Sequence, residues 1–583
     1  MTASALSEAS ERDLPSTPDS ETERRGWALR LAPYLAVLAG VAAVAWHATR
    51  YKHWIVDDAA ITFSYARSFA DGLGPVLQPG APPVEGFSDP TWMVLLALGK
   101  VAGLFDHGLL LGIPDYVLFP KLLGLLFTGG ILAGFQVAAR QIFRRHAWAI
   151  TLVAGLTLAT IPSFVIWVVS GLENSLFAFG VVWLAVLLFV AARKDNLLSW
   201  KVATVAGLLV AFCALTRPDG LIYVGAYPLA VLWQLRRPVL GTSIKHVLIS
   251  LAAFAIPFGA YVAWRHSEFG GRLLANPSIA KQQGLPDLTS IIRPGALVLY
   301  IGVAAVVVVA ALIVWAMVKA PWRRALYVLL TPFALGIVAF GVLIPDWMDQ
   351  YRFATPVWAL GALAGTMCLA EFLRTVKAPV IRVVALVVVI ASLVPSAIGF
   401  VKVSDKFIKS PTIPACLVAD RFGRGFNTIA DMLGLQQASL LLPDLGGSSM
   451  TSRLQLVDMA GLVEANVADY LHKDDIHGLR DYVFDKVKPT FIHSWGPWAS
   501  GNGIAVDPRI DQDYYPIFVY PGPGLRNGDF VRKDAVTDMA KLEAVRHYAA
   551  TTMMNVEGQH FVTAPLDDCG PTMKPGQTIA PRG

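Results

Sequence analysis

The chain of 583 residues is 55% hydrophobic and only 15% charged, which is more apolar than a soluble protein of this length. The apolar residues come in long runs, so the sequence predicts a protein that crosses a membrane several times. Its 48 Lys and Arg against 42 Asp and Glu give a formal net charge of +6. In such a chain the positions of basic residues matter more than their sum, and we expect no binding of nucleic acid.

Residues 1–28 are rich in Ser, Thr, Glu and Pro, and this composition predicts a disordered tail. The first apolar segment has no clear small-residue cleavage site, so we expect it to be retained as a helix. Runs of roughly 20 apolar residues, long enough to cross a bilayer, then follow along the chain. The eleven predicted spans lie near 31–48, 117–139, 148–169, 172–192, 202–216, 220–235, 246–264, 296–318, 325–344, 354–373 and 380–401.

Basic residues occur in every second connection between these spans, as around Arg24, Arg144 and Arg374. Because cytoplasmic loops carry an excess of Lys and Arg, this pattern places the N-terminus in the cytoplasm and the C-terminus outside. Residues 91–105 are apolar but too short to cross, and counting them as a span would put Arg144 outside. We therefore expect an interfacial helix there, within a first outer loop formed by residues 49–116.

The predicted organisation is thus a polytopic helical membrane domain at 29–402, followed by an extracytoplasmic domain at 403–583. The second part mixes strand-like runs (ASLLLP, RLQLVD, PTFIHS) with a helical stretch (LVEANVADYLHK), which favours an α/β domain. Cys416 and Cys569 lie near its two ends, outside the cytoplasm, where disulfides persist. We expect these cysteines to pair, with two free thiols as the alternative.

The polar sequences that a purely structural membrane protein would not need all fall on the outer side. They are HWIVDDAAITFSYAR, VEGFSDPTW, SGLEN, TRPDG, WRHSEFGGRLLANPSIAK and PDWMDQYRF. The inner loops are short and nearly featureless apart from their basic residues. This asymmetry argues against a transporter, which is expected to have polar residues within its spans and two similar halves.

Asp57 and Asp58 form an acidic pair in the first outer loop, directly after a span. Acidic residues at a membrane surface are functional candidates, and a carboxylate there can act as general base toward a hydroxyl group. Arg and Lys side chains on the same side are suited to binding phosphate. The candidates for such an anion site are Arg217, Arg265, Lys281 and Arg352. A base and a phosphate site at a membrane surface together indicate transfer from a lipid-phosphate donor.

The order of these motifs resembles that of the GT-C glycosyltransferases, integral membrane enzymes that use polyprenyl-phosphate sugars. Within them, the first loop is most similar to the mycobacterial terminal β-(1→2)-arabinofuranosyltransferase family of arabinogalactan biosynthesis. SGLEN resembles that family's S-G-L-E, TRPDG its R-P-[DE], LLANPSIAK its P-[NSH]-T-x-x-A-K and PDWMDQYRF its G-D-[WF]-M-x-x-R. The stretch RLQLVDMAGLVEANVADYL also resembles a segment of its outer domain.

The resemblance implies catalytic roles for Asp57 and Asp58, and a set of residues that bind donor or acceptor. Together with Arg265, named above for its charge, this set comprises Glu85, Ser88, Glu173, Arg217, Asp219, Asn276, Lys281, Asp346 and Arg352. It further implies transfer of arabinofuranose from decaprenyl-phosphate to a cell-envelope glycan, such as arabinogalactan or lipoarabinomannan, outside the plasma membrane. No cofactor is expected.

Several alternatives stay open at this stage. Asp57 or Asp58 could cap the following helix, and if a divalent cation is present the pair would be its ligands. Trp347, Trp54 and Trp92 are more typical of interface anchors than of sugar platforms. For the function, the alternatives are a mannosyl- or other polyprenyl-phosphate glycosyltransferase with a different acceptor, and a lipid-glycan transporter without catalytic activity.

Overall fold

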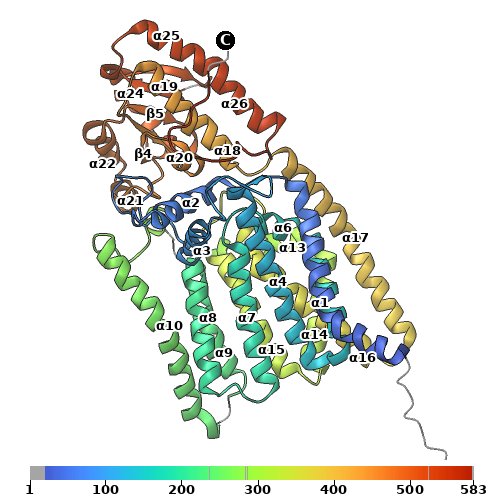
Figure 1. The fold of residues 1–583 in the computed structure, drawn as a ribbon. Helices are drawn as coiled ribbons and strands as arrows, with labels where there is room; N and C mark the ends of the chain where they lie inside the picture. Colours follow the sequence, from blue (N-terminus) through green and yellow to red (C-terminus); the bar gives the residue numbers. More distant parts are fainter. Residues whose placement is uncertain (1–19, 236, 283, 285, 523, 581–583) are drawn as a thin grey trace, which may run out of the picture.

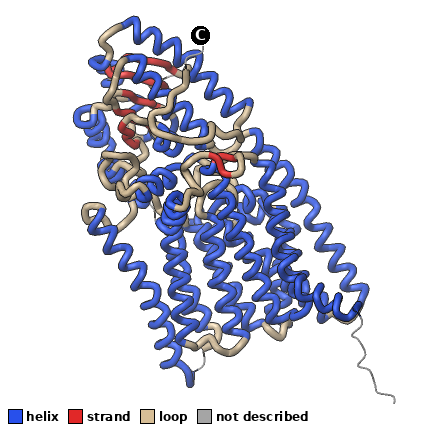
Figure 2. The backbone as a smooth tube through the Cα atoms, viewed as in Figure 1, coloured by secondary structure: helices blue, strands red, loops and turns tan. Residues whose placement is uncertain are grey.

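The computed structural model describes residues 20–235, 237–282, 284, 286–522 and 524–580. It has two parts, a bundle of long helices and a smaller mixed domain at one end of the bundle (Figure 1). The tube view shows that the main sheet lies in the smaller part (Figure 2). The predicted fold class, a polytopic helical membrane protein with a C-terminal α/β domain, is confirmed.

Helices occur at all eleven positions where the sequence predicts spans. The helices of the bundle are α1 (Ser20–Ala48), α4 (Asp115–Phe143), α5 (Ala147–Thr160), α6 (Pro162–Val168), α7 (Asn174–Arg193), α8 (Trp200–Thr216), α9 (Ala226–Leu232), α10 (Leu240–Glu268), α13 (Gly295–Ile301), α14 (Val303–Lys319), α15 (Arg323–Val342), α16 (Thr355–Thr375) and α17 (Pro379–Lys409). By length and composition, 7 helical stretches of the described chain can cross a membrane, or up to 8 if one bent pair is a single span. One of these stretches, Asp115–Thr160, contains both α4 and α5, which pack against each other.

Three of the predicted spans differ from straight helices because of proline and glycine. The span at 148–169 is interrupted at Ile161, whose extended conformation is the one favoured before a proline. The span at 220–235 begins as a 3-10 segment, Pro218–Gly225, before α9. The span at 296–318 bends by 106° at Gly302, which has a φ of +100°.

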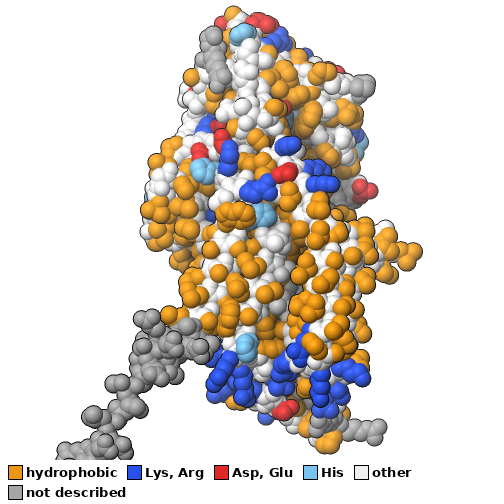
Figure 3. Space-filling view, turned by 90° about the vertical axis from the view of Figure 1, so that its right-hand side faces the viewer, with side chains coloured by type: hydrophobic (Ala, Val, Ile, Leu, Met, Phe, Trp, Pro, Cys, Tyr) orange, Lys and Arg blue, Asp and Glu red, His pale blue; other side chains and the backbone are white. Residues whose placement is uncertain are grey.

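On the face drawn in Figure 3, hydrophobic side chains cover the helical part in a broad belt, and Lys and Arg gather at its end away from the mixed domain. Arg140, Arg144 and Arg145 line a cleft of about 350 Å³ at a turn between helices. Part of the predicted disordered tail, from Ser20 onward, is helical, because α1 begins at Ser20. The rest of that tail, residues 1–19, lies outside the described residues.

The first outer loop contains α2 (Asp57–Ala70), α3 (Pro90–Val101) and a small hairpin of β1 (Leu109–Leu110) and β2 (Ile113–Pro114). With 12 residues, α3 is too short to cross a bilayer, as predicted for this segment. Two further short helices, α11 (Asn276–Ala280) and α12 (Leu288–Ile292), lie between α10 and α13.

The C-terminal domain is built around a five-stranded sheet in the order β4-β3-β5-β7-β6. Its strands are β3 (Ser439–Leu442), β4 (Gln455–Asp458), β5 (Phe491–Ser494), β6 (Tyr514–Val519) and β7 (Gly528–Arg532). The strands β3, β4 and β5 are parallel to one another. β7 pairs antiparallel with β5, and β6 pairs antiparallel with β7. Its helices are α18 (Ala415–Val418), α19 (Gly425–Leu433), α20 (Gly446–Thr451), α21 (Ala465–His472), α22 (Ile476–Asp481), α23 (Gly496–Gly501), α24 (Arg509–Asp513), α25 (Met539–Tyr548) and α26 (Met554–Gly558).

Both faces of this sheet are covered. Alternate residues of each strand point to opposite faces, so Leu441 and Ile492 belong to one apolar cluster, and Leu440 and Phe491 belong to another. The carboxyl ends of β3, β4 and β5 lead into Asp444, Leu462 and Trp498, respectively. In parallel sheets this edge is the usual position for a ligand site.

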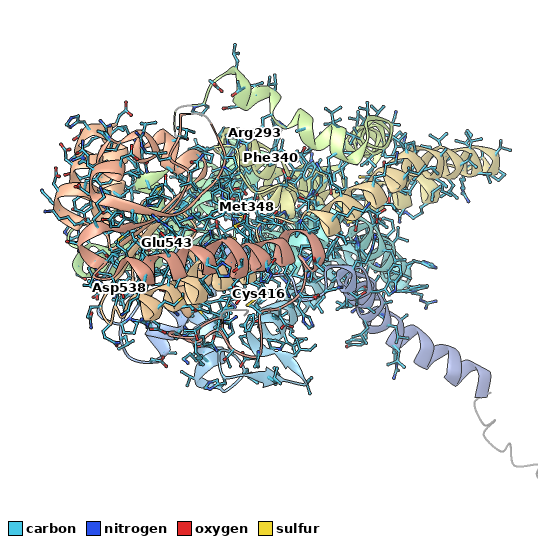
Figure 4. The ribbon with its side chains drawn as sticks, turned by 90° about the horizontal axis from the view of Figure 1, so that it is seen from above. Arg293, Phe340, Met348, Cys416, Asp538 and Glu543 are labelled. Carbon is cyan, nitrogen blue, oxygen red and sulfur yellow. A yellow bond between two sulfur atoms is a disulfide. The ribbon has the colours of Figure 1, made fainter. Side chains whose placement is uncertain are left out.

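The first outer loop is joined to both ends of the C-terminal domain. The Asp57 amide donates to the Ile413 carbonyl at 2.9 Å, and the Ala415 amide donates to the Ile55 carbonyl at 2.9 Å. Cys416, labelled in the view from above, forms the expected disulfide with Cys569, with their Cα atoms 5.2 Å apart (Figure 4).

Candidate functional site

A cavity of about 570 Å³ lies where the helical bundle meets the C-terminal domain. Most of the charged residues predicted for the site line it. They are Asp58, Glu173, Arg217, Asp219, Lys281, Asp346 and Arg352, together with Ser88. Leu462 and Trp498 are the lining residues that come from the C-terminal domain. Segments that are hundreds of residues apart in the sequence therefore share one hollow.

The structure separates the two members of the acidic pair. Asp57 is buried, and its carboxylate accepts hydrogen bonds from the amides of Gly446 and Gly447, at 3.0 Å and 2.7 Å. Asp58 is half-buried and lines the cavity. Neither side chain caps α2, whose N-cap residue is Val56, so the capping alternative is wrong. Asp57 therefore connects the first loop to the C-terminal domain, and Asp58 is the member of the pair that lines the cavity.

The surroundings of Asp58 favour its protonated form. Burial raises the pKa of its carboxyl group above the ordinary value, and the positive charges of Lys281 and Arg352 oppose this shift. The negative charges of Asp346 and Glu173 add to it. A carboxylate with a raised pKa is a stronger proton acceptor when ionised, as a general base requires.

Arg217 is held between two carboxylates at the C-terminal end of α8. Its Nη1 lies 2.6 Å from Glu173 Oε1, and its Nε lies 2.9 Å from Asp219 Oδ1. The guanidinium also lies over the ring of Phe353, 4.7 Å from the centroid. Extended backbone at Arg217, the residue before Pro218, ends the helix and turns this side chain into the cavity wall.

The other two cations of the cavity differ in their pairing. Arg352 forms an ion pair with Asp346, with Nε 2.5 Å from Oδ2. Within the part of the chain that the structure describes, the Lys281 ammonium makes no hydrogen bond or ion pair, and its side chain is exposed to the cavity. Lys281 is therefore the cation that an anionic ligand can reach without displacing a carboxylate.

Contacts of Arg293 hold the loop that carries Asp346 against the helical bundle. Arg293 Nη2 donates to the Ile344 carbonyl at 3.3 Å, and its guanidinium lies 5.0 Å from the ring centroid of Phe340. Met348 in the same loop is buried, and Figure 4 labels it together with Arg293 and Phe340. These contacts hold the cavity rim in place.

Three residues expected to bind donor or acceptor do not line the cavity. Glu85 is buried against Arg265 and accepts from Tyr261 Oη at 2.5 Å. Asn276 donates its amide side chain to the Gly461 carbonyl at 2.7 Å. Their polar groups contact one another and join the first loop, α10 and the C-terminal domain, so in this structure these contacts are internal to the protein.

Asp89 and Trp498 line the cavity and were missed by the sequence analysis. Asp89 accepts from Thr62 Oγ1 at 3.1 Å, and burial together with the charge of Glu173 raises the pKa of its carboxyl group. It lies in the quoted motif VEGFSDPTW, where an acid before proline was the available signal. Trp347, expected to anchor in the membrane interface, also lines the cavity.

No group of three or more His, Cys, Asp or Glu side chains in the described residues is arranged to hold a metal ion. Both carboxylate oxygens of Asp57 already accept backbone hydrogen bonds. The pair therefore does not present two free carboxylates to one cation.

The contact between Asp57 and the C-terminal domain can be tested at Gly446. A β-carbon there would collide with the carbonyl and carboxylate oxygens of Asp57. We expect Gly446→Ala to lower the free energy of unfolding by about 1–3 kcal/mol, measured by denaturation of the full chain in detergent. Gly558→Ala in α26 is the control, because nothing lies within 4 Å of its β-carbon. Equal stability of the two variants would contradict this role of Asp57.

No protein-family model and no curated protein matches the sequence. Among solved structures, the chain resembles the oligosaccharyltransferase AglB from Archaeoglobus fulgidus, in complex with an inhibitory peptide and a dolichol-phosphate. The identity is 12%, the match covers 80% of this chain and 69% of that one, and the TM-score is 0.46. It also resembles ArnT from Cupriavidus metallidurans bound to undecaprenyl phosphate, at 14% identity, 78% and 88% coverage and a TM-score of 0.44. These values describe a likeness in the course of the chain and carry no conclusion about its reaction.

Proposed function

We propose that this protein is a membrane glycosyltransferase of the GT-C type, which transfers a sugar from a polyprenyl-phosphate donor to a glycan. The observation that carries the proposal is the shared cavity of Asp58, Lys281 and Arg352, at the junction of apolar helices and an α/β domain. A lipid-linked donor needs a reaction site beside the membrane, and a glycan acceptor needs one open to water. The cavity meets both needs.

In the proposed reaction the Asp58 carboxylate accepts the proton of an acceptor hydroxyl group. The acceptor oxygen forms a bond to the anomeric carbon of the donor, and the bond between that carbon and the phosphate oxygen breaks. The electron pair of the broken bond stays on the lipid phosphate, whose charge increases. Lys281 stabilises this charge directly, because its ammonium has no carboxylate partner among the described residues.

Arg217 and Arg352 act mainly by position. Arg352 is paired with one carboxylate and Arg217 with two, so neither adds a full positive charge to the cavity. Fixed, buried pairs of this kind keep their orientation during the reaction and need no reorganisation. We propose that they hold the phosphate against Lys281 and leave Asp58 free for the acceptor.

The finer assignment rests on the resemblance of the ordered motifs. It names arabinofuranose as the sugar, decaprenyl-phosphate as the carrier and an arabinan-containing cell-wall glycan as the acceptor. The active side would then be the outer face of the plasma membrane, with the N-terminus in the cytoplasm. The gathering of Lys and Arg at the far end of the bundle supports this orientation (Figure 3).

The deciding experiment is a transfer assay with the purified full-length chain in detergent. Decaprenyl-phosphoryl arabinofuranose and a synthetic oligoarabinofuranoside are expected to give a longer oligosaccharide and free decaprenyl-phosphate. Turnover of a mannosyl donor alone would replace arabinose by mannose in the proposal. Movement of a lipid-linked glycan across vesicles without any transfer would favour the transporter instead.

Lys281→Met is expected to lower kcat/KM for the donor about 10- to 100-fold, the usual worth of a hydrogen bond to a charged group. Lys281→Arg should retain part of the activity because the charge remains. The measurement is the initial rate against donor concentration at a fixed acceptor concentration. Lys52→Met, at an exposed ion pair outside the cavity, is the control and should change little. An unchanged kcat/KM in Lys281→Met would remove this residue from the phosphate site.

A further inference from the structure

The size of the cavity limits how much of a glycan it encloses. At about 570 Å³ it lies within the range of about 300–1,000 Å³ that holds one small ligand. The sugar phosphate of the donor and the terminal sugar of the acceptor would fill it. The remaining sugars of a polymeric acceptor must therefore lie on a surface outside the cavity, and this surface determines which acceptors bind well.

Two tryptophans stand at this exit, one from each part of the protein. Trp347 is 53% exposed and Trp498 is 37% exposed, and both line the cavity. Other tryptophans are exposed too, such as Trp46, Trp200 and Trp233, but they do not line the cavity. Trp347 and Trp498 combine exposure with a place in the cavity wall, where a sugar ring can cover them.

The backbone that carries these tryptophans is held by local contacts. Trp498 lies in α23, directly after β5, and its carbonyl accepts from the Asn502 amide at 3.1 Å. Trp347 precedes the buried Met348, whose Sδ lies 3.7 Å from Arg352 Nη1. A tryptophan side chain has only two rotatable bonds and loses little conformational entropy when it binds a ligand, which favours this residue at recognition surfaces.

The charges of the cavity separate its two ends. Lys281, Arg217 and Arg352 all come from the helical part, whereas the C-terminal domain contributes Leu462 and Trp498, which are uncharged. The carboxylates that line the cavity also come from the helical part, and both arginines are paired with them. An anionic donor is therefore expected at Lys281, which has no carboxylate partner among the described residues. The uncharged side suits a neutral glycan, which offers hydroxyl groups and the apolar C–H faces of its rings.

We infer that Trp347 and Trp498 bind the acceptor glycan from two sides, through the sugar rings that follow the reacting one. This inference rests on the proposed function and adds to it the residues that recognise the acceptor and the length that they recognise, several sugar residues rather than one. It also gives the C-terminal domain a part in choosing the acceptor.

The test compares a short and a long acceptor with the full-length protein in detergent. Trp347→Ala and Trp498→Ala are each expected to raise the KM for a tetrasaccharide about tenfold, equivalent to about 1.4 kcal/mol of binding, with kcat unchanged. The KM for a monosaccharide glycoside should stay the same. Trp347→Phe and Trp498→Phe should restore most of the affinity. Trp200→Ala, at a 61% exposed tryptophan outside the cavity, is the matched control.

Equal KM changes for both acceptors, or no change for either, would overturn the inference. If an alanine variant does not fold, the phenylalanine variant at that position is compared with its leucine counterpart. Binding of the tetrasaccharide without donor, followed by calorimetry, provides a second readout. Absence of transfer by the wild type with every donor would refute the proposed function, whereas transfer with tryptophan variants that bind normally would refute the inference alone.

Discussion

Asp58→Asn is expected to lower kcat for glycosyl transfer by about 10²–10⁴-fold, the usual contribution of a general base. The amide has nearly the same shape as the carboxylate but cannot accept the proton of the acceptor hydroxyl group. Because Lys281 and Arg352 remain in the cavity, donor binding should survive. The measurement is the initial rate at saturating donor and acceptor, together with the KM of the donor.

Two further variants locate the effect. Asp71→Asn, at the other end of α2 and outside the cavity, replaces the exposed partner of Lys100; it is the control and should leave kcat unchanged. Asp57→Asn should lower the stability of the chain more than its kcat, since both oxygens of Asp57 accept backbone amides. Loss of kcat in Asp57→Asn with full activity in Asp58→Asn would show that the base is the other carboxylate.

The pH dependence of the wild-type activity is a further test of Asp58 as the general base. The base must be ionised, so activity falls as the pH drops through the pKa of Asp58. Since burial raises this pKa, the loss should begin at a higher pH than for an ordinary aspartate, whose pKa is about 3.9. Lys281 lowers the pKa, so Lys281→Met should move the acid limb of kcat/KM to a still higher pH.

Arg421→Leu is expected to destabilise the C-terminal domain by about 3–5 kcal/mol, because it leaves a buried charge without its partner. Arg421 and Asp529 are both almost completely buried, with Nη2 2.5 Å from Oδ2. His493 Nδ1 lies 2.6 Å from the other oxygen of Asp529. The measurement is chemical denaturation of the full chain in detergent, with protease resistance of the C-terminal domain as a second probe.

The pKa of the Asp529 carboxyl group predicts how the stability provided by this ion pair changes with pH. Burial alone would raise the pKa of Asp529, but Arg421 and His493 outweigh it and lower the pKa. The stabilisation is therefore present above the ordinary aspartate pKa and is lost as the pH falls through the lowered value. Adding Asp529→Asn to Arg421→Leu should recover part of the stability. Arg546→Leu, beside the exposed Glu543 labelled in Figure 4, is the control and should cost less than about 1 kcal/mol. A small loss in Arg421→Leu, similar to the control, would contradict the argument.

Patterns within short segments were enough to predict the helical part, the α/β domain and three of its strands. They were also enough to single out Asp58, Lys281 and Arg352, because each lies beside a membrane surface in a polar motif. The strands β6 and β7 were missed because no alternation in 514–532 distinguished them from loops. The hydrogen-bond partners of Asp57 and Glu85 could not be predicted from such patterns, because they lie 389 and 180 residues away in the sequence.

The breaks in the helices likewise depend on both local sequence and distant residues. Pro162 and Gly302 are visible in the sequence, but their effect depends on whether neighbouring helices satisfy the freed backbone groups. Trp347 is a further example. A tryptophan beside the predicted end of a span is typical of an interface anchor. Only the fold of residues 343–353 brings its side chain to the cavity.

The pairing of His53 with Asp568 joins residues that are 515 positions apart. At a synthesis rate of about 5–20 residues per second, the ribosome needs about 25–100 s to make the intervening chain. The first loop, including Asp58, therefore exists for all of that time before its final partners are made. The disulfide to Cys569 closes only after nearly the whole chain is complete. A truncated or stalled chain would carry every charged residue of the cavity and still lack the segment that holds the first loop in place.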